Sequence, residues 1–286
     1  MSKQFKRLYE LNITTPTGLT RTIKDLRINF EVTKSVLSYP NLARITLYNL
    51  APDSLSALQT KFTKIVLNAG YEGNIKLVFT GEVRNVFQER NGTDKMTTLY
   101  AGDGQRSWQN SIFNKTFTES ITVQTVIADL LNSFSDIGTG IIEGIPSVAS
   151  NLLGQTLSGS SKDILDTLAD EYGFNWSITD GIINTAPIET PLQVSEAVLI
   201  SAATGMIGSP TVTEIGADVT TLLNPLLMPE SAFTIESINA DIQLGNLYFR
   251  DVARTSAEGT YKTQEVVLKG DNREGLWTST VKGRLF

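Results

Sequence analysis

The sequence predicts a mainly β protein with an α+β middle part, and three observations support this class. Near both ends of the chain apolar residues alternate at period two, as in Ile28, Phe30 and Val32. Between residues 121 and 134 the apolar residues instead have helical spacing. The 286 residues are 41% apolar and 19% charged, within or near the ordinary globular range, which argues against wholesale disorder.

A first β region is expected over residues 1–104. Pro52 begins a short helix whose apolar residues are Leu55, Leu58 and Phe62. Gly81 suits a bulge or tight bend, so residues 75–90 form either two strands or one long bent strand. Asn91-Gly92 is a strong hairpin signal, because both positions tolerate positive φ. The other strands are expected near residues 8–13, 23–32, 43–49, 64–69 and 95–101.

The middle region, residues 105–190, is expected to mix helices and strands. Thr122 is a plausible N-cap for a helix that continues to Phe134. A second helix is predicted from Lys162 to Tyr172, with Ser160 or Ser161 as N-cap and Gly173 ending it. A hairpin should follow, with strands at 174–178 and 182–186 around a turn at Asp180-Gly181.

The segment 135–159 between these helices is rich in Gly and Ser but also in Ile and Leu, so it is too apolar for a solvated linker. One interpretation is a packed irregular loop with a short helix near 146–153. The alternative is a partner-binding segment that becomes ordered on assembly.

From Pro191 onward the chain returns to β structure, which gives a third region, residues 191–286. Gly and Pro residues separate its predicted strands. These strands are expected at 196–202, 211–215, 217–223, 232–238, 244–253 and 261–269.

Two stretches of the chain resemble each other. Gly81–Asn85 leads to a strand that ends in Gly102-Asp103, and Arg250–Arg254 leads to one that ends in Gly270-Asp271. A duplicated β unit would explain this, although two unrelated antiparallel hairpins can also look alike. Two copies of one unit per chain would let a trimer present six similar surfaces to a sixfold neighbour.

The composition excludes several kinds of chemistry. The chain has no Cys and no His, which removes disulfides, most zinc sites and all catalysis that uses a His base. Its net charge of −6 argues against a bulk surface that binds nucleic acid non-specifically. The basic N-terminus lacks a following apolar core, so it is not a secretory signal, and no stretch is long enough to span a membrane.

The remaining site motifs are weak, and we expect no catalytic, metal or cofactor site. Gly138-Thr139-Gly140 has the wrong spacing for dinucleotide binding, and Gly154–Ser160 lacks the Lys of a phosphate loop. Four carboxylates on the second predicted helix are interpreted as a solvated face. They are Asp163, Asp166, Asp170 and Glu171. The three tryptophans, Trp108, Trp176 and Trp277, are interpreted as core or interface anchors.

Several segments resemble the hub proteins of phage tail baseplates, of the late control protein D kind. The resemblance covers both β regions, about two thirds of the chain, and reaches the middle only in layout. It rests on the following segments: Pro40–Leu50, Ile65–Tyr71, Val78–Val83, Thr204–Val212, Leu222–Pro225, Gly259–Tyr261, Lys269–Arg273 and Trp277.

This resemblance implies a fold and a role. The fold would be two tube-like antiparallel β-barrel domains that flank the smaller α+β insertion. The protein would be a homotrimeric hub of a contractile, Mu-like tail, made in the bacterial cytoplasm and built into the virion. Its pseudo-sixfold ring would join the sixfold tail tube to the threefold central spike and let DNA pass, without specific nucleic-acid binding. The other implied partners are a tube-initiator protein, the tape measure protein and the baseplate wedge proteins.

Two further roles stay open at this level: another tail tube or initiator component, and a tail-associated cell-wall hydrolase. For the hub, strand edges and apolar segments such as 135–159 and 196–210 are expected to lie in interfaces, and apolar residues there and at the C-terminus are the candidate interface residues. They are Ile141, Ile142, Ile145, Leu152, Leu153, Met206, Ile207 and Phe286.

Overall fold

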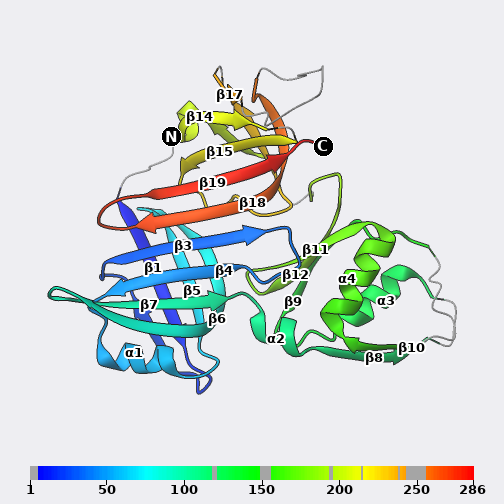
Figure 1. The fold of residues 1–286 in the computed structure, drawn as a ribbon, viewed down its shortest axis with the longest axis horizontal. Helices are drawn as coiled ribbons and strands as arrows, with labels where there is room; N and C mark the ends of the chain where they lie inside the picture. Colours follow the sequence, from blue (N-terminus) through cyan, green and yellow to red (C-terminus); the bar gives the residue numbers. More distant parts are fainter. Residues whose placement is uncertain are drawn as a thin grey trace.

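The computed structural model of the chain describes residues 6–117, 121–148, 156–192, 196–213, 215–237, 239–242 and 256–286. Within these residues the chain forms one fourteen-stranded sheet, a three-stranded sheet and a two-stranded sheet. Figure 1 shows the large sheet beside a smaller α+β body. No helix in the described part is long and apolar enough to cross a lipid bilayer.

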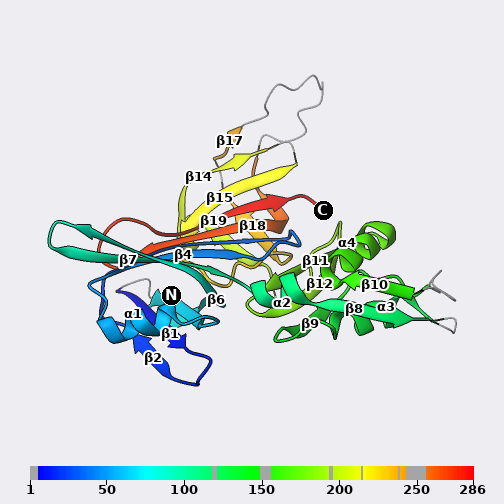
Figure 2. The ribbon, with the colours of Figure 1, turned by 60° about the horizontal axis from the view of Figure 1, so that its bottom comes forward.

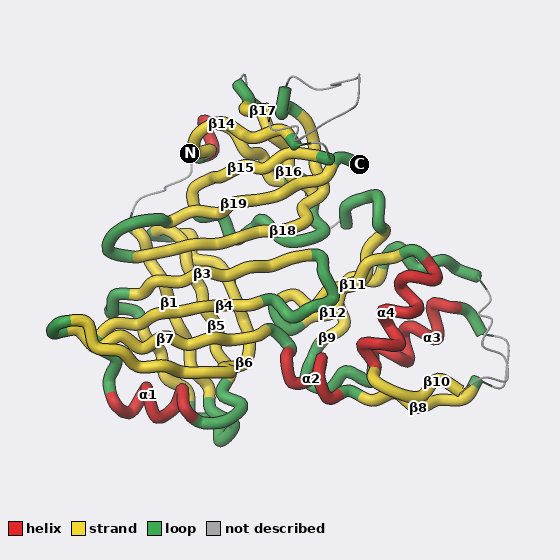
Figure 3. Tube along the Cα trace, viewed as in Figure 1, coloured by secondary structure: helices red, strands yellow, loops and turns green. Residues whose placement is uncertain are grey.

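The first β region folds into two layers of one sheet. Strands β3, β4 and β7 lie in front in Figure 1, and β1 and β5 cross behind them. The helix α1 packs at the open end of this region (Figure 3). The elements are β1 (Arg7–Thr14), β2 (Thr20–Ile23), β3 (Ile28–Ser35), β4 (Leu42–Tyr48), α1 (Pro52–Gln59), β5 (Lys64–Tyr71), β6 (Asn74–Asn91) and β7 (Asp94–Gly102).

The long strand β6 connects the two layers. Its residues Asn74–Glu82 pair with β5, and its residues Glu82–Asn91 pair with β7. The change of partner falls at Glu82, directly after Gly81, in agreement with the prediction of one long bent strand. A Cβ at Gly81 would lie 2.6 Å from the carbonyl oxygen of Gly102 and 2.6 Å from the Phe79 ring, so only glycine fits this close approach.

The third region supplies the rest of the large sheet, which runs in the order β17-β14-β15-β19-β18-β3-β4-β7-β6-β5-β1-β2. A parallel pair, β13 and β16, joins it through β18. The elements are β13 (Val198–Ser201), a 3₁₀ turn (Ala202–Thr204), β14 (Met206–Val212), β15 (Gly216–Leu222), β16 (Ala232–Glu236), β17 (Asp241–Ile242), β18 (Gly259–Asp271) and β19 (Trp277–Arg284).

The ladder between β3 and β18 joins the two β regions. Asn29–Ser35 pair with Glu265–Asp271 in an antiparallel register. Both regions also contribute to one hydrophobic core, in which Phe30 and Trp277 meet edge to face at 5.4 Å. The mainly β class is therefore confirmed. The sheet is continuous across both regions, and the closure of each region into a barrel stays a prediction.

The middle region has a separate core. The helices α3 and α4 pack against the hairpin β11–β12, and the core includes Leu130, Leu165 and Trp176. The Thr122 hydroxyl accepts a hydrogen bond from Thr125 N, which confirms the predicted N-cap, and Gly173 ends α4 at φ 73°. The elements are α2 (Gln105–Asn110), β8 (Ile112–Thr116), α3 (Val123–Leu131), β9 (Gly138–Ile142), β10 (Thr156–Ser160), α4 (Ser161–Tyr172), β11 (Phe174–Thr179) and β12 (Ile182–Pro187).

Several local predictions were wrong. The segment 135–159 includes two strands, because β9 pairs in parallel with β12 and β10 pairs with β8. Residues 146–148 are not helical, and 149–155 lie outside the described residues. Helix α1 ends at Gln59, and Phe62 is exposed in a left-handed conformation instead of continuing the apolar stripe. Strand β14 begins at Met206, earlier than expected, and β19 was missed.

The predicted repeat is only partly visible. The first hairpin is β6–β7, and the second copy's final strand is β18, but Arg250–Arg254 lie outside the described residues. The aspartates of the two Gly-Asp pairs accept hydrogen bonds from different parts of the chain. Asp271 accepts hydrogen bonds from the next turn of the chain, at Arg273 N and Glu274 N. Asp103 accepts them from the distant turn at Asp180-Gly181. Duplication stays a prediction.

The bend at Gly81 gives a direct test of this fold. We expect Gly81→Ala to lower the free energy of unfolding by about 1–3 kcal/mol, because the added Cβ must displace backbone. The measurement is urea unfolding followed by tryptophan fluorescence. Gly138→Ala is the matched control, since a Cβ there meets nothing closer than 3.8 Å. Equal stability of the two variants would contradict the account of the bend.

Candidate functional site

The middle region is attached to the large sheet through a buried ionic cluster. Lys34 on β3 is fully buried, and its Nζ donates to Asp180 Oδ2 at 2.6 Å, in the turn between β11 and β12. Asp103, at the end of β7, accepts hydrogen bonds from the backbone N–H groups of Asp180 and Gly181. Asn41 adds a third contact, donating from Nδ2 to the carbonyl of Ile178 at 2.7 Å. The tip of the hairpin is therefore fixed by a group on β3, one directly after β7 and one directly before β4.

A second buried lysine makes a similar attachment on the neighbouring strand. Lys262 on β18 is 1% exposed, and its Nζ lies 2.5 Å from Glu230 Oε2. The same Nζ donates to the carbonyls of Pro187 and Ile188, just after β12. Glu230 in turn accepts a hydrogen bond from Asn175 on β11 at 3.2 Å. Because both hairpin strands are tied to the sheet, the middle region has a defined orientation relative to it.

These attachments carry an electrostatic cost, because two carboxylates share one lysine in the first cluster. Burial, together with the nearby charge of Asp180, raises the pKa of Asp103 from 3.8 to about 7. The Gly181 N–H and the Lys34 ammonium oppose this rise. Burial likewise raises the pKa of Glu230, against the hydrogen bond from Lys262. Proton uptake by Asp103 near neutral pH is thus coupled to the contact between the middle region and the large sheet, which we call the joint.

One face of the large sheet is polar, and no described helix or strand covers it. Figure 2 shows α1, β1 and β2 all on the same side of the layer formed by β4 and β7. Along β3 the even-numbered residues Ile28–Lys34 are buried on that side, and the odd-numbered ones are on the other. The uncovered face continues onto β18, β19 and β15 through the shared register.

Charges on this face alternate in sign from strand to strand. Two cross-strand rows follow from the register: Asp218, Lys282 and Glu265 in one, and Lys269, Glu31 and Arg44 in the other. Lys282 lies 2.8 Å from Glu265, and Lys269 lies 3.0 Å from Glu31. The hydrogen bond from Lys282 to Glu265 raises the pKa of Lys282.

Threonine pairs fill much of the space around these rows. Thr220 and Thr280 are hydrogen-bonded across β15 and β19 at 3.1 Å, and Thr46 and Thr98 across β4 and β7 at 3.0 Å. Apolar and aromatic side chains interrupt the polar pattern at several positions, which are Val267, Leu222, Leu42, Tyr48, Met96 and Tyr100. The face is therefore hydrophilic and close to neutral in charge.

The predicted interface residues fall in two separate places. Ile142, Ile145 and Phe286 line one groove of about 870 Å³ between the end of β9, the end of β12 and the C-terminus. Ile141 is half-buried, and its N–H donates to Asn184 Oδ1 at 2.9 Å. Leu152 and Leu153 lie outside the described residues. Whether this groove is an interface stays a prediction.

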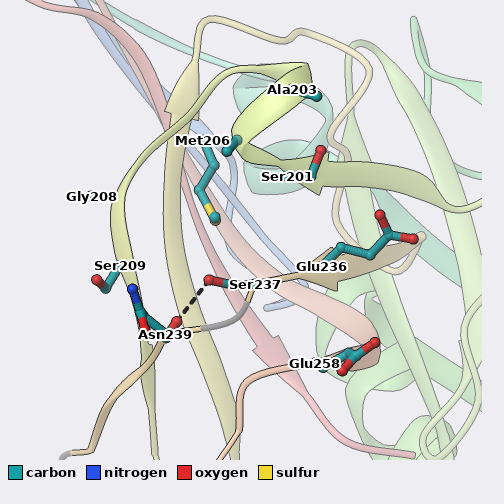
Figure 4. Close-up of a pocket in the computed structure, with 10 residues that line it drawn as sticks. Ser201, Ala203, Met206, Gly208, Ser209, Glu236, Ser237, Asn239 and Glu258 are labelled. Carbon is teal, nitrogen blue, oxygen red and sulfur yellow. Dashed lines mark hydrogen bonds between the residues drawn. The ribbon is translucent and has the colours of Figure 1, made fainter.

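Met206 lies elsewhere, in a pocket of about 650 Å³ at the β14 end of the sheet. Figure 4 shows its side chain inside the pocket, with Glu236 and Glu258 at the ends of two neighbouring strands. Ser237 donates to the carbonyl of Asn239 at 2.7 Å across one wall. Ile207, the next residue, is 43% exposed. Nothing in the local sequence around Met206 predicts these acidic neighbours.

The catalytic and cofactor motifs have structural roles where the structure describes them. Asp166 is not simply solvated, because it accepts a hydrogen bond from Trp176 Nε1 at 2.8 Å. Gly138-Thr139-Gly140 forms part of strand β9, and residues 156–160 form β10. Trp108 donates a hydrogen bond to the carbonyl of Ser38, and the Lys162 ammonium group lies over its ring at 4.3 Å. No group of three or more possible metal ligands occurs among the residues that the structure describes.

The fold is that of phage tail proteins. The 43 kDa tail protein of prophage MuSo2 from Shewanella oneidensis matches with a TM-score of 0.63 and 9% identity, over 96% of each chain. A tail protein from Neisseria meningitidis MC58 matches at 0.61 and 6%, also over 96% of each chain. The Escherichia coli c3393 protein, a component of the type VI secretion system, matches at 0.60 and 11%, over 91% of this chain and 73% of its own.

At sequence level, the family model described as baseplate hub gp41 matches residues 9–243, which is most of the chain. The chain therefore belongs to the baseplate hub gp41 family and is a structural component of a phage tail. No protein with a curated description matches it in sequence. The family resemblance seen in the sequence is confirmed.

The burial of Lys34 predicts that removing this lysine costs more stability than removing an exposed one. We expect Lys34→Met to lower the free energy of unfolding by about 3–5 kcal/mol, because it leaves two carboxylates buried without a cation. Lys269→Met on the neighbouring strand is the control. It breaks an exposed pair with Glu31, so its cost should be at most about 1 kcal/mol. Similar losses in urea unfolding for both variants would refute the role given to Lys34.

The raised pKa of Asp103 predicts a specific pH dependence. Between pH 3.8 and about 7 the folded chain binds this proton and the unfolded chain releases it, so Asp103 lowers stability as the pH rises through that window. Asp103→Asn should remove this contribution, so the stability difference between variant and wild type should shift in favour of the variant from pH 5 to pH 8. Urea midpoints measured at each pH test this. A difference that is constant with pH would contradict it.

Proposed function

We propose that this hub subunit forms a trimeric ring of a contractile tail, which joins the sixfold tail tube to the threefold spike and lets DNA pass. The observation that carries the proposal is the uncovered polar face, which runs without a break over β15, β19, β18, β3, β4 and β7. A surface that crosses both β regions is suited to form a continuous wall.

The charge pattern of this face is what a DNA channel requires. Unpaired lysines and arginines would bind phosphates and release counterions, which would hold the DNA in place. Unpaired carboxylates would repel it and slow its entry. Here Lys282 and Lys269 are each engaged by a carboxylate on the neighbouring strand. Arg44 and Asp218, the charges of these rows that form no ion pair with a described residue, are opposite in sign. The net charge of −6 for the whole chain also opposes tight DNA binding. In this proposal DNA passes through the ring without specific contacts.

The arrangement of the β regions supports three copies around one axis. Each chain contributes two β regions, which the β3–β18 ladder joins into one sheet. Three chains would therefore contribute six β regions. Such a ring would offer a sixfold surface to the tail tube or its initiator and keep true threefold symmetry toward the spike. The two-barrel form of each chain belongs to this proposal.

The middle region would then face other tail proteins. Its two lysine attachments hold it at a defined angle to the wall, which suits a platform for the spike, the tape measure protein or the wedge proteins. The groove lined by Ile142, Ile145 and Phe286 is the part of it that we assign to such contacts. We also propose that the protein acts without catalysis, because its family is structural and Asp166 is bonded to Trp176.

The ring proposal predicts a defined copy number. The purified chain, alone or mixed with the spike protein of the same tail, should sediment as a species containing three copies of the 31.3 kDa chain. Sedimentation velocity at several concentrations measures this. A chain that stays monomeric under both conditions would sink the proposal, and six copies would favour a tube component instead.

A further inference from the structure

The two ends of the large sheet carry opposite features. Figure 1 shows β14 and β17 at one end of the molecule, and α1 and β6 at the other. Among the described residues, the lysines and arginines with no ion pair, hydrogen bond or ring contact all lie between Arg44 and Lys95, in the first β region. The carboxylates of Glu236 and Glu258, which make no ion pair with any described residue, lie at the opposite end.

The first end has a hollow of about 370 Å³ between the α1–β5 connection and β6. Lys61, Phe62 and Arg84 line it. Phe62 adopts φ 62°, a region that a bulky side chain rarely occupies, and the residue is 53% exposed. The Arg106 guanidinium lies over this ring at 4.7 Å. A strained backbone that presents an aromatic ring to solvent is typical of a binding surface.

Arg84 owes its position to an irregularity in the sheet. The register between β6 and β7 shifts between Val83 and Asn85, so Arg84 has no partner in the ladder. A bulge of this kind turns a side chain away from the direction that regular pairing would give it. Two unpaired cations, Lys61 and Arg84, thus flank an exposed aromatic ring.

The second end presents the complementary set. Ile235 pairs with Gly259 in the β16–β18 ladder, which places Glu236 and Glu258 at adjacent positions. Two neighbouring carboxylates without a cation repel each other, so a cation from outside would be favoured. The pocket they border contains the Met206 side chain, a flexible thioether that packs well against aromatic rings.

We propose that these two ends meet between copies of this chain: the Lys61-Phe62-Arg84 end of one copy docks on the Met206-Glu236-Glu258 end of the next. The contact rests on the ring proposed above and specifies its interface. Because the two surfaces are different and lie at opposite ends of one sheet, the contact is head-to-tail and repeats around a closed ring. It would also extend the polar face from one copy to the next.

The absence of natural cysteine allows a direct test. In the full chain carrying both Lys61→Cys and Glu236→Cys, a short bismaleimide should link copies into covalent trimers on a denaturing gel. Each single variant alone should give no linked species, and a mixture of the two single variants should give only dimers. Lys76→Cys with Glu236→Cys is the control and should stay unlinked, because Lys76 lies near the β5–β6 turn, away from the hollow.

The outcomes separate this contact from the ring itself. If the unmodified chain sediments as a trimer but the double variant stays unlinked, or Lys61→Cys alone forms dimers, the head-to-tail contact is wrong and the ring survives. If the unmodified chain never assembles, both proposals fail together.

A second variant guards against loss of folding. Phe62→Gly relieves the positive φ and removes the ring, so its unfolding midpoint should match or exceed that of wild type. Its trimer should nevertheless dissociate at a concentration at least about tenfold higher. An unchanged dissociation concentration would overturn the role of Phe62 as the anchor.

Discussion

The ladder between β3 and β18 is the constraint on which the rest of the structure depends. It joins Asn29–Ser35 to Glu265–Asp271, segments from opposite ends of the chain, and makes one sheet from two β regions. The same two strands carry Lys34 and Lys262, whose ammonium groups attach the middle region. On their other face they carry Glu31, Lys269 and Glu265 of the polar surface. The register between β3 and β18 therefore sets the relative positions of the hydrophobic core, the joint and the polar face.

The two buried lysines show how the chain positions the middle region through polar contacts. Burying a charge is costly, and a buried ion pair is weak evidence for net stability. Such pairs instead define the orientation of the middle region, because the ammonium group reaches all its acceptors in only one arrangement. Lys262 contacts the carbonyls of Pro187 and Ile188 as well as Glu230, so it fixes the exit of the hairpin. Lys34 and Asp103 fix its tip. A defined angle between the middle region and the sheet is therefore what these two attachments contribute.

The sequence predicted what depends on local pattern. The cap at Thr122, the end of α4 at Gly173 and the bend at Gly81 each follow from residue chemistry within one turn or strand. It missed what depends on distant partners. Strand β8 finds β10 some forty residues later, and β19 reads as a polar Thr- and Ser-rich stretch, because its outward residues belong to the open face. Lys34 did leave a signal, since it continues the Ile28, Phe30, Val32 alternation onto the buried side.

The candidate site shows the same division. The apolar candidates were chosen for composition alone, and the structure places Ile142, Ile145 and Phe286 in one groove and Met206 in another. The carboxylates of Glu236 and Glu258 near Met206, and Arg84 near Phe62, come from distant parts of the chain, so no local pattern could connect them. Electron cryo-microscopy of the assembled tail tests the central claim most directly. We predict three copies in a closed ring, with Glu31, Lys269, Glu265 and Lys282 facing the lumen. A ring in which this face is turned outward or covered by another protein would contradict the account.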